Sequence, residues 1–241
     1  MNYKGNNFYI DNIGVSNLVK NHETPIYAYS LNKLKKNINI FKKNFKNINP
    51  LICFSVKSNS NIKILSQIKK FGLGADVVSI GELISALKAG INEKKIVFSG
   101  VGKTNQELEF AIKKKILLIN SESEEELIEI EKIAKKRKVV VDVGVRLNPD
   151  IDALTINKIS TGKKDNKFGI SAFEILGILL RFKKSKYINI KCLSVHIGSQ
   201  ITRISPYKKV LSVISKLLKR ANYKSDLLFQ QLQKSKVYER F

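Results

Sequence analysis

From residue 51 onward, short apolar runs alternate with stretches in which apolar residues recur every three or four positions. The apolar runs begin near Leu51, Gly74, Lys95, Ile116, Val139 and Ile190. The first five starts are 21 to 23 residues apart, and a longer gap precedes the sixth. Short strands that alternate with helices at a regular interval predict parallel βαβ units.

The composition of these runs supports the same interpretation. Ile96-Val97-Phe98 and Val139-Val140-Val141 are apolar at every position, as expected of strands that are covered on both faces. Between them, Leu127, Ile130 and Ala134 mark one face of a helix. The central part of the chain is therefore expected to be an α/β domain.

The first thirty residues lack the regular interval. Residues 8–30 predict irregular structure that ends in a strand, Ile26-Tyr27-Ala28-Tyr29, and a helix is expected from Leu31 to about Lys46. Residues 148–168 form a polar excursion, which is too long for an ordinary connector and is expected to be functional or mobile. The predicted domains are an N-terminal segment (1–30), a βα domain (31–223) and a divergent tail (224–241).

The regular interval fits either an eight-stranded (β/α)8 barrel of the TIM type or an open doubly wound sheet. Polar residues lie in, end or follow successive apolar runs: Lys57, Asp76, Ser99, Ser121, Arg146, Asn148, His196 and Ser199. Barrels collect their active sites at the carboxyl ends of many strands, whereas a doubly wound sheet concentrates its site at one switch point. No G-x-G-x-x-G opens a helix. We therefore expect a barrel, of which about six of the eight βα units are present.

Lys57 is the most informative single residue. It follows the apolar run from Leu51 to Val56 and precedes a polar segment that starts at Ser58. An amine at the carboxyl end of a buried strand can condense with a carbonyl group, and burial would favour its neutral form. The alternative is an ordinary solvated lysine, since Lys57 is one of 38 in the chain.

The net charge of +24 raises the question of a nucleic-acid partner. Only six of the 44 basic residues are arginines, and the lysines accompany abundant isoleucine and asparagine. This pattern favours compositional drift over a nucleic-acid surface, although salt-sensitive attraction to polyanions is expected.

The remaining composition predicts a soluble cytoplasmic protein without a metal site. Cys53 and Cys192 both lie in predicted strands and have no Cys or His at ligand spacing, so zinc is not expected. The start of the sequence has no signal-like apolar stretch, and no segment reaches the ~18 apolar residues of a membrane span. A membrane partner is therefore not expected.

Six ordered motifs carry a family resemblance. They are Phe54-Ser55-Val56-Lys57-Ser58-Asn59-Ser60, Gly74-Ala75-Asp76-Val77 through Glu82-Leu83, Val97-Phe98-Ser99-Gly100-Val101-Gly102-Lys103-Thr104, Arg146-Leu147-Asn148-Pro149, Thr161-Gly162 with Asn166-Lys167-Phe168-Gly169, and His196-Ile197-Gly198-Ser199-Gln200. From about Phe8 to Tyr223 the chain resembles the pyridoxal phosphate (PLP) decarboxylases with an alanine-racemase-like barrel, in particular their diaminopimelate branch.

The resemblance implies a role for each candidate residue. Lys57 would bind PLP as a Schiff base, and His196 would stack on its ring. Ser199 would donate to the phosphate, Asp76 would orient the lysine region, and Arg146 would lie beside the cofactor. Alternatives remain for three of them: His196 could be a core histidine, Asp76 could cap a turn or pair with a lysine, and Arg146 could be a structural ion-pair partner.

The resemblance also implies the reaction, decarboxylation of meso-2,6-diaminopimelate to L-lysine. Beyond Asn222 the sequence departs from the family pattern, and the later barrel units and β domain are not found. Six strands cannot close an eight-stranded barrel. We therefore expect an impaired or inactive form. Full-length members would be homodimers, and the residues that complete their interface lie in the part not found here.

Two alternatives to that reaction stay open. One is a noncatalytic PLP-binding barrel, and the other is a related ornithine or arginine decarboxylase.

Overall fold

The computed structural model describes residues 2–20, 22–155, 160–162, 168–222 and 227–230. Its contacts divide the chain into two units, Met1–Ile52 and Cys53–Phe241. The helix after residue 30 is thereby grouped with the first unit. The domain limits predicted from the sequence (1–30, 31–223 and 224–241) stay predictions.

The first unit begins with a small antiparallel sheet. Its elements are β1 (Asn2–Lys4), β2 (Asn7–Ile10), β3 (Ile13–Gly14), α1 (Val15–Lys20), α2 (Leu31–Asn44) and the 3-10 helix η1 (Lys46–Ile48). Ser30 caps α2 by accepting a hydrogen bond from the Lys33 amide at 2.9 Å. The helix thus begins where the sequence predicted and ends two residues early.

The strand predicted at 26–29 is wrong, because no strand is found among residues 22–30. Tyr27 and Tyr29 are 90% and 56% exposed. A β-prone segment needs a neighbouring strand and a surface to pack against, and within the described part of the first unit residues 26–29 have neither.

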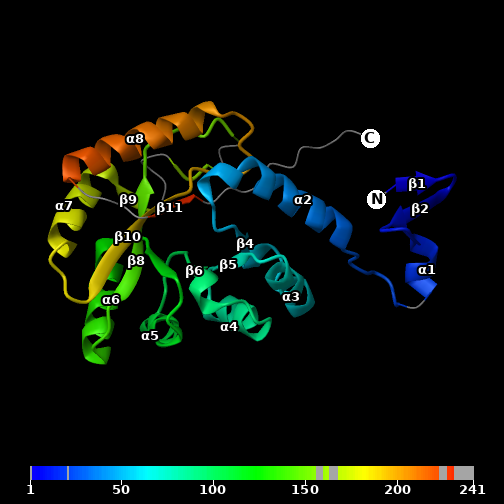
Figure 1. Cartoon of the computed structure of the whole chain (residues 1–241), viewed down its shortest axis with the longest axis horizontal. Helices are drawn as coiled ribbons and strands as arrows, with labels where there is room; N and C mark the ends of the chain where they lie inside the picture. Colours follow the sequence, from blue (N-terminus) through cyan, green and yellow to red (C-terminus); the bar gives the residue numbers. More distant parts are fainter. Residues whose placement is uncertain (1, 21, 156–159, 163–167, 223–226, 231–241) are drawn as a thin grey trace. The chain divides into compact units, whose positions relative to one another are not determined.

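The second unit contains a curved parallel sheet (Figure 1). Its main strands are β4 (Cys53–Ser55), β5 (Gly74–Val77), β6 (Ile96–Phe98), β7 (Leu118–Ser121), β8 (Val141–Asn148), β10 (Ile188–Val195) and β11 (Leu227–Gln230). They pair in chain order, from β4 at one end of the sheet to β11 at the other, and the two-residue β9 (Ile170–Ser171) pairs with β8. The six predicted strands each begin within two residues of their expected starts.

β11 departs from the prediction of six strands. It pairs in parallel with β10 and lies within the segment expected to be a divergent tail. The described sheet therefore carries seven consecutive parallel strands.

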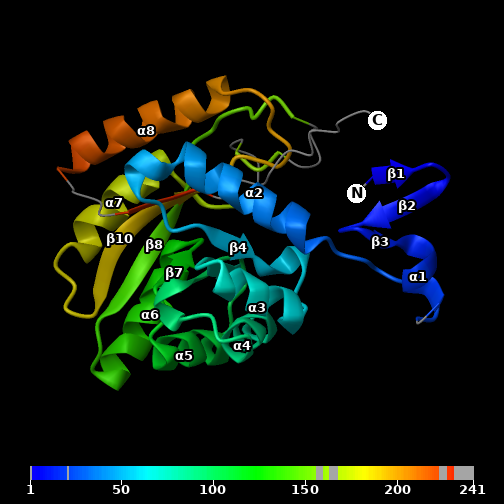
Figure 2. The same ribbon diagram turned by 45° about the vertical axis from the view of Figure 1, so that its right-hand side comes forward.

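Helices connect these strands and follow one another around the sheet (Figure 2). They are η2 (Val56–Ser58), α3 (Ile62–Lys70), α4 (Ile80–Lys88), η3 (Glu93–Lys95), α5 (Asn105–Lys114), α6 (Glu124–Arg137), α7 (Ala172–Phe182) and α8 (Ser205–Ala221). Leu127, Ile130 and Ala134 of α6 are fully buried, as the sequence predicted. This arrangement confirms an α/β fold of parallel βαβ units.

One face of the sheet changes from apolar to polar along the strands. Side chains two apart on a strand share a face, and Val97, Leu118 and Cys192 form one buried cluster against which Cys53 packs. Two residues further along the chain from each of these stand Ser99, directly after β6, and Asn120, Ser194 and Ser55, within their strands. The carboxyl ends of the strands therefore supply polar groups above an apolar layer.

A bulge in β10 sets the facing of its second half. Ile190 pairs with Val143, yet Cys192 pairs with Gly144, so one extra residue, Lys191, is accommodated between them. The Lys191 amine lies 2.8 Å from Asp142 Oδ2. Beyond the bulge, Ser194 pairs with Arg146.

Candidate active site at the carboxyl ends of the strands

A buried hydrogen-bonded chain crosses three strand ends. Asn120 Nδ2 donates to Ser99 Oγ at 3.0 Å, and Ser99 Oγ donates to Asp76 Oδ1 at 2.8 Å. All three residues are at most 8% exposed. Asp76 is therefore a buried carboxylate in β5 that accepts a hydrogen bond from a hydroxyl.

Gly144 makes room for Asn120. A Cβ atom at Gly144 would lie 2.0 Å from Asn120 Oδ1, which is far inside van der Waals contact. Asn120 Oδ1 is buried and has no hydrogen-bond partner among the described residues. A buried acceptor without a donor is costly, and the absent side chain at position 144 permits its placement here.

Arg146 is held from two sides. Its Nη1 atom donates to Glu122 Oε1 at 2.7 Å, and its guanidinium lies 4.8 Å from the ring centroid of Phe168. The Arg146 and Glu122 side chains are 12% and 6% exposed. The predicted alternative, a structural ion pair, is thus present, and it lies inside the polar strand-end region.

His196 and Ser199 follow β10, and two threonines hold their backbone. Thr161 Oγ1 donates to the His196 carbonyl at 2.7 Å, and Thr155 Oγ1 donates to the Ser199 carbonyl at 2.9 Å. Both His196 and Ser199 are partly buried. The described parts of the polar excursion therefore contact the segment that carries two predicted site residues.

A small cavity lies among the polar side chains at the strand ends. Its lining consists of Ser99, Asn120, Glu122, Arg146, Ser194, Val195 and His196. Its volume of about 10 Å³ is near the lower limit for one water molecule. The cavity is therefore a polar floor, and a larger ligand would have to lie above it.

Lys57 lies directly after β4, in η2. Its side chain is exposed, so the expected burial of the amine is wrong in this structure. Because β4 and β10 are parallel members of one sheet, Lys57 and His196 both follow carboxyl ends and belong to the same edge.

Asn120 and Glu122 are site residues that the sequence analysis missed. It selected Ser121 after the fourth apolar run, but Ser121 Oγ donates to the Ser123 carbonyl and does not line the cavity. The alternation of facing along β7 was the available signal, because Asn120 lies two residues after Leu118 of the apolar layer.

Burial also affects a thiol below the polar layer. Burial, and secondarily the charge of Asp76, raise the pKa of Cys53 to about 12. Cys53 is therefore an inert apolar side chain near neutral pH, as expected from its place in a strand.

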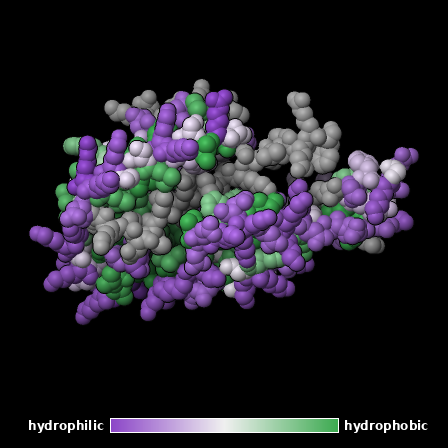
Figure 3. Space-filling model, turned by 45° about the horizontal axis from the view of Figure 1, so that its top comes forward, coloured by the Kyte–Doolittle hydropathy of each residue, from purple (hydrophilic) through white to green (hydrophobic). Residues whose placement is uncertain are grey.

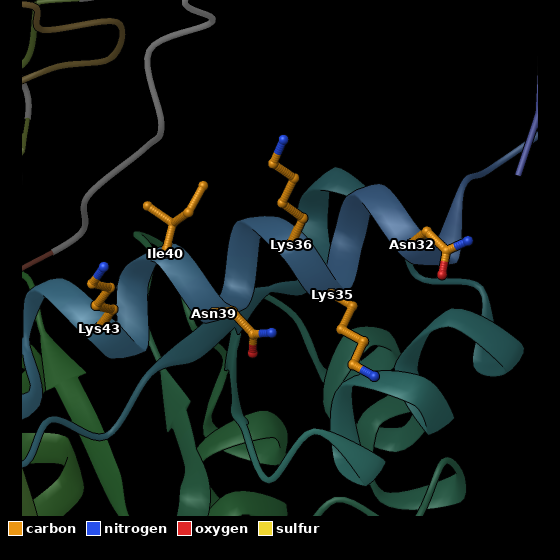
Figure 4. Close-up of a pocket in the computed structure, with 6 residues that line it drawn as sticks. All are labelled: Asn32, Lys35, Lys36, Asn39, Ile40 and Lys43. Carbon is orange, nitrogen blue, oxygen red and sulfur yellow. The ribbon is translucent and has the colours of Figure 1, made fainter. Parts of the chain in front are cut away.

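A second hollow lies on the first unit, along α2 (Figure 4). Its lining residues are Asn32, Lys35, Lys36, Asn39, Ile40 and Lys43. Their side chains point in different directions and converge on no common point in Figure 4. None of the predicted site residues contributes to it.

No helix in the described part of the chain is both long and apolar enough to cross a membrane.

The curated relatives include proteins from Helicobacter pylori and Vibrio cholerae that are named diaminopimelate decarboxylase. The one from Helicobacter pylori is 44% identical over 202 residues, which cover 84% of this chain and 50% of the relative. The one from Vibrio cholerae is 39% identical over 198 residues, which cover 82% of this chain and 47% of the relative. The chain spans about half the length of the curated relatives it matches.

Solved structures of proteins with the same name are also similar to this chain. A crystal structure of diaminopimelate decarboxylase from Helicobacter pylori complexed with L-lysine matches with a TM-score of 0.81 and 42% identity, over 86% of this chain and 53% of that one. One from M. jannaschii, also with L-lysine, matches with a TM-score of 0.89 and 32% identity, over 99% and 58%.

The family described as pyridoxal-dependent decarboxylase, pyridoxal binding domain, matches residues 31–232. This match passes Asn222, where the sequence analysis placed the departure from the family, and it includes β11. The chain therefore belongs to the pyridoxal-dependent decarboxylases, and their pyridoxal-binding domain accounts for most of its length.

Proposed function

We propose that this chain binds PLP through Lys57 and that the activity of the protein is decarboxylation of meso-diaminopimelate to L-lysine. The observation that carries the proposal is the convergence of polar groups from successive strands at one end of the sheet. The names of the relatives, and the L-lysine bound in two similar structures, support the substrate class.

The residues at this end fit a polar cofactor. Ser55 Oγ, Asn120 Oδ1 and Glu122 Oε2 are buried and have no hydrogen-bond partner among the described residues. Unpaired polar atoms of this kind are costly unless a ligand or water satisfies them. The same edge supplies an exposed amine at Lys57, an imidazole at His196 and a hydroxyl at Ser199, which suit an aldehyde, a flat ring and a phosphate respectively.

Each protein group then has a defined task. Bound PLP supplies the electron sink that decarboxylation requires. Lys57 supplies the nitrogen that holds the cofactor, and His196 bounds one side of its ring. Ser199 donates to the phosphate, while Asp76 holds a negative charge that Ser99 stabilises by a hydrogen bond at 2.8 Å. Arg146 places a cation beside the ring, and the carboxylate of Glu122 balances its charge.

The partners follow from this proposal. A small amino acid is the substrate, with neither nucleic acid nor membrane required. We further propose the cytoplasm as the compartment, because free amino acids and PLP meet there, and a homodimer as the state of full-length family members.

PLP uptake tests the cofactor assignment. The purified chain is incubated with PLP, reduced with borohydride and digested, and the peptide that carries the added mass is identified. We expect the label on Lys57 and its loss in Lys57→Ala, but not in Lys63→Ala, an exposed lysine on the following helix. A label spread over many lysines, or one unaffected by Lys57→Ala, would overturn the assignment.

Substrate choice requires a second assay. Release of carbon dioxide is measured with meso-diaminopimelate, ornithine and arginine. Turnover of diaminopimelate alone supports the proposal. Specific labelling of Lys57 without turnover of any substrate supports the noncatalytic alternative for this chain, and turnover of ornithine or arginine supports the related decarboxylases.

A further inference from the structure

A buried ion pair lies beside the candidate site. Lys103 Nζ is 2.6 Å from Glu126 Oε1, and the two side chains are 1% and 11% exposed. Lys103 stands between β6 and α5, and Glu126 lies in the first turn of α6. Neither was selected from the sequence as a site residue.

The pair forms hydrogen bonds with the backbone at the ends of β6 and β7. Lys103 Nζ donates to the Gly100 carbonyl at 2.6 Å and to the Asn120 carbonyl at 2.8 Å. Glu126 Oε2 accepts from the Glu122 amide at 3.1 Å. The backbone is thus held on both sides of Ser121.

Two of the residues that the pair holds, Asn120 and Glu122, also present hydrogen-bond acceptors to the cavity. Asn120 Oδ1 and Glu122 Oε2 have no hydrogen-bond partner among the described residues, and both residues line the cavity. The other Glu122 oxygen holds Arg146 at 2.7 Å. A shift of this short backbone segment would therefore move two acceptors and a cation together.

Stability alone gives a weak reason for such a pair. Desolvation of two charges offsets much of their attraction, and apolar replacement of both partners is often neutral. Burial raises the pKa of Glu126 although Lys103 opposes it. The pair's hydrogen bonds to three backbone groups instead fix the backbone positions of Gly100, Asn120 and Glu122.

We propose that Lys103 and Glu126 are positioning residues for the cofactor site. They fix the backbone of residues 120–122 and thereby the acceptors of Asn120 and Glu122 and the guanidinium of Arg146. This inference rests on the proposed function, because PLP is the group for which the acceptors are placed.

The test compares two double variants of the full chain. Lys103→Met/Glu126→Met removes the buried pair, and Glu129→Met/Lys132→Met removes an exposed pair on the same helix with the same 2.6 Å separation. Three quantities are measured: the urea midpoint of unfolding, hydrogen exchange of the amides at 120–122, and the dissociation constant of PLP from a titration followed by absorbance.

We expect the buried-pair variant to exchange faster at 120–122 and to bind PLP at least about tenfold more weakly. Its urea midpoint should fall, because the Gly100 and Asn120 carbonyls and the Glu122 amide lose their partners. The exposed-pair variant should match the wild type in all three. Glu126→Gln, which keeps the shape and an acceptor for the Glu122 amide, provides the comparison and should retain most of the PLP affinity.

The remaining outcomes separate this inference from the proposed function. Failure of the wild-type chain to take up PLP at Lys57 overturns the proposed function, and the positioning role falls with it. Specific uptake by the wild type together with equal PLP affinity in the buried-pair variant overturns the positioning role alone. Unchanged exchange at 120–122 in that variant also overturns it.

Discussion

The Asn120 side chain shows how a single glycine can shape a polar site. Its amide oxygen occupies the space that a side chain at residue 144 would fill, while its amide nitrogen begins the hydrogen-bonded chain to Asp76. Because the two residues are register partners on β7 and β8, neither backbone can shift to relieve a contact without breaking strand pairing. The choice of glycine here is therefore a matter of space rather than of backbone conformation.

We predict that Gly144→Ala destabilises the chain by about 1–3 kcal/mol, since the added methyl group overpacks a rigid site. Urea unfolding monitored by circular dichroism measures the change. Gly177→Ala is the matched control, because a Cβ there meets nothing within 4 Å. Its position inside helix α7 predicts a gain of about 0.5–1 kcal/mol.

A double variant separates the clash from any other effect of the substitution. Asn120→Ala in the Gly144→Ala background removes the clashing oxygen and should recover part of the lost stability. If the double variant is no more stable than Gly144→Ala, the amide oxygen is not the source of the cost.

Individual site residues were predictable where position along a strand was enough. Asp76, Arg146 and His196 stand out because a charged or imidazole group lies within or follows an apolar run. Asn120 was not predictable in the same way, because Ser121 beside it is equally polar, and only the facing of β7 decides between them. The exposure of Lys57 depends on the turn of η2, which local composition does not specify.

At the scale of helices, one carboxylate serves two of them. Glu107 Oε2 accepts from the Thr104 amide at 2.9 Å and completes a capping box on α5, while Oε1 accepts from the Ile80 amide at 3.1 Å at the start of α4. These hydrogen bonds, that of Thr104 foremost, lower the pKa of Glu107. The two helix starts are thereby joined through a single side chain.

We predict that Glu107→Gln lowers the free energy of unfolding by about 1 kcal/mol near pH 7. The folded-state pKa lies below the unfolded value of ~4.3, so the charge stabilises above that value and the benefit is lost as pH falls through the folded-state pKa. The difference between variant and wild type should therefore shrink in acid. Urea unfolding at several pH values measures it.

Glu174→Gln is the control for the bridging role. Glu174 caps only α7, through Ser171, and its pKa is also lowered, mainly by that serine. It should show the same direction of pH dependence with a smaller loss. A loss at Glu174 as large as that at Glu107 would argue against a contribution from the Ile80 bond.

Strands were predictable where they have a clear apolar pattern and where the elements that cover them are close in sequence. The regular interval of apolar runs located six strands, because each strand is covered by the helices that flank it in sequence. The segment 26–29 has the composition of a strand but no partner, and β11 has a partner that the chain reaches only after α8. Pairing over such distances is absent from local composition.

For the whole molecule, charge is the dominant property. Hydrophilic side chains are spread widely over the face shown in Figure 3, with hydrophobic patches between them, and the net charge is +24. Salt bridges such as Arg181–Glu124, at 2.6 Å with both partners exposed, use few of the basic groups. The excess therefore acts as a diffuse field on polyanions of any sequence.

We predict that the chain is retained on heparin near physiological salt and is released as salt rises toward ~1 M, because screening shortens the range of the field to ~3 Å there. Fluorescence titrations with unrelated DNA duplexes should give equal affinities at each salt concentration. Tight binding of one sequence that persists at high salt would favour a nucleic-acid function over compositional drift.

The extra residue in β10 carries a consequence for the whole active end. At the bulge the alternation of side-chain facing along β10 shifts by one residue. Ser194 therefore pairs with Arg146, and His196 follows at the lining of the cavity. Had Lys191 paired with Gly144 in an unbroken ladder, every later side chain of β10 would point to the opposite surface and the imidazole would leave the floor of the site. The arrangement of this end thus depends on the bulge that leaves Lys191 out of the pairing.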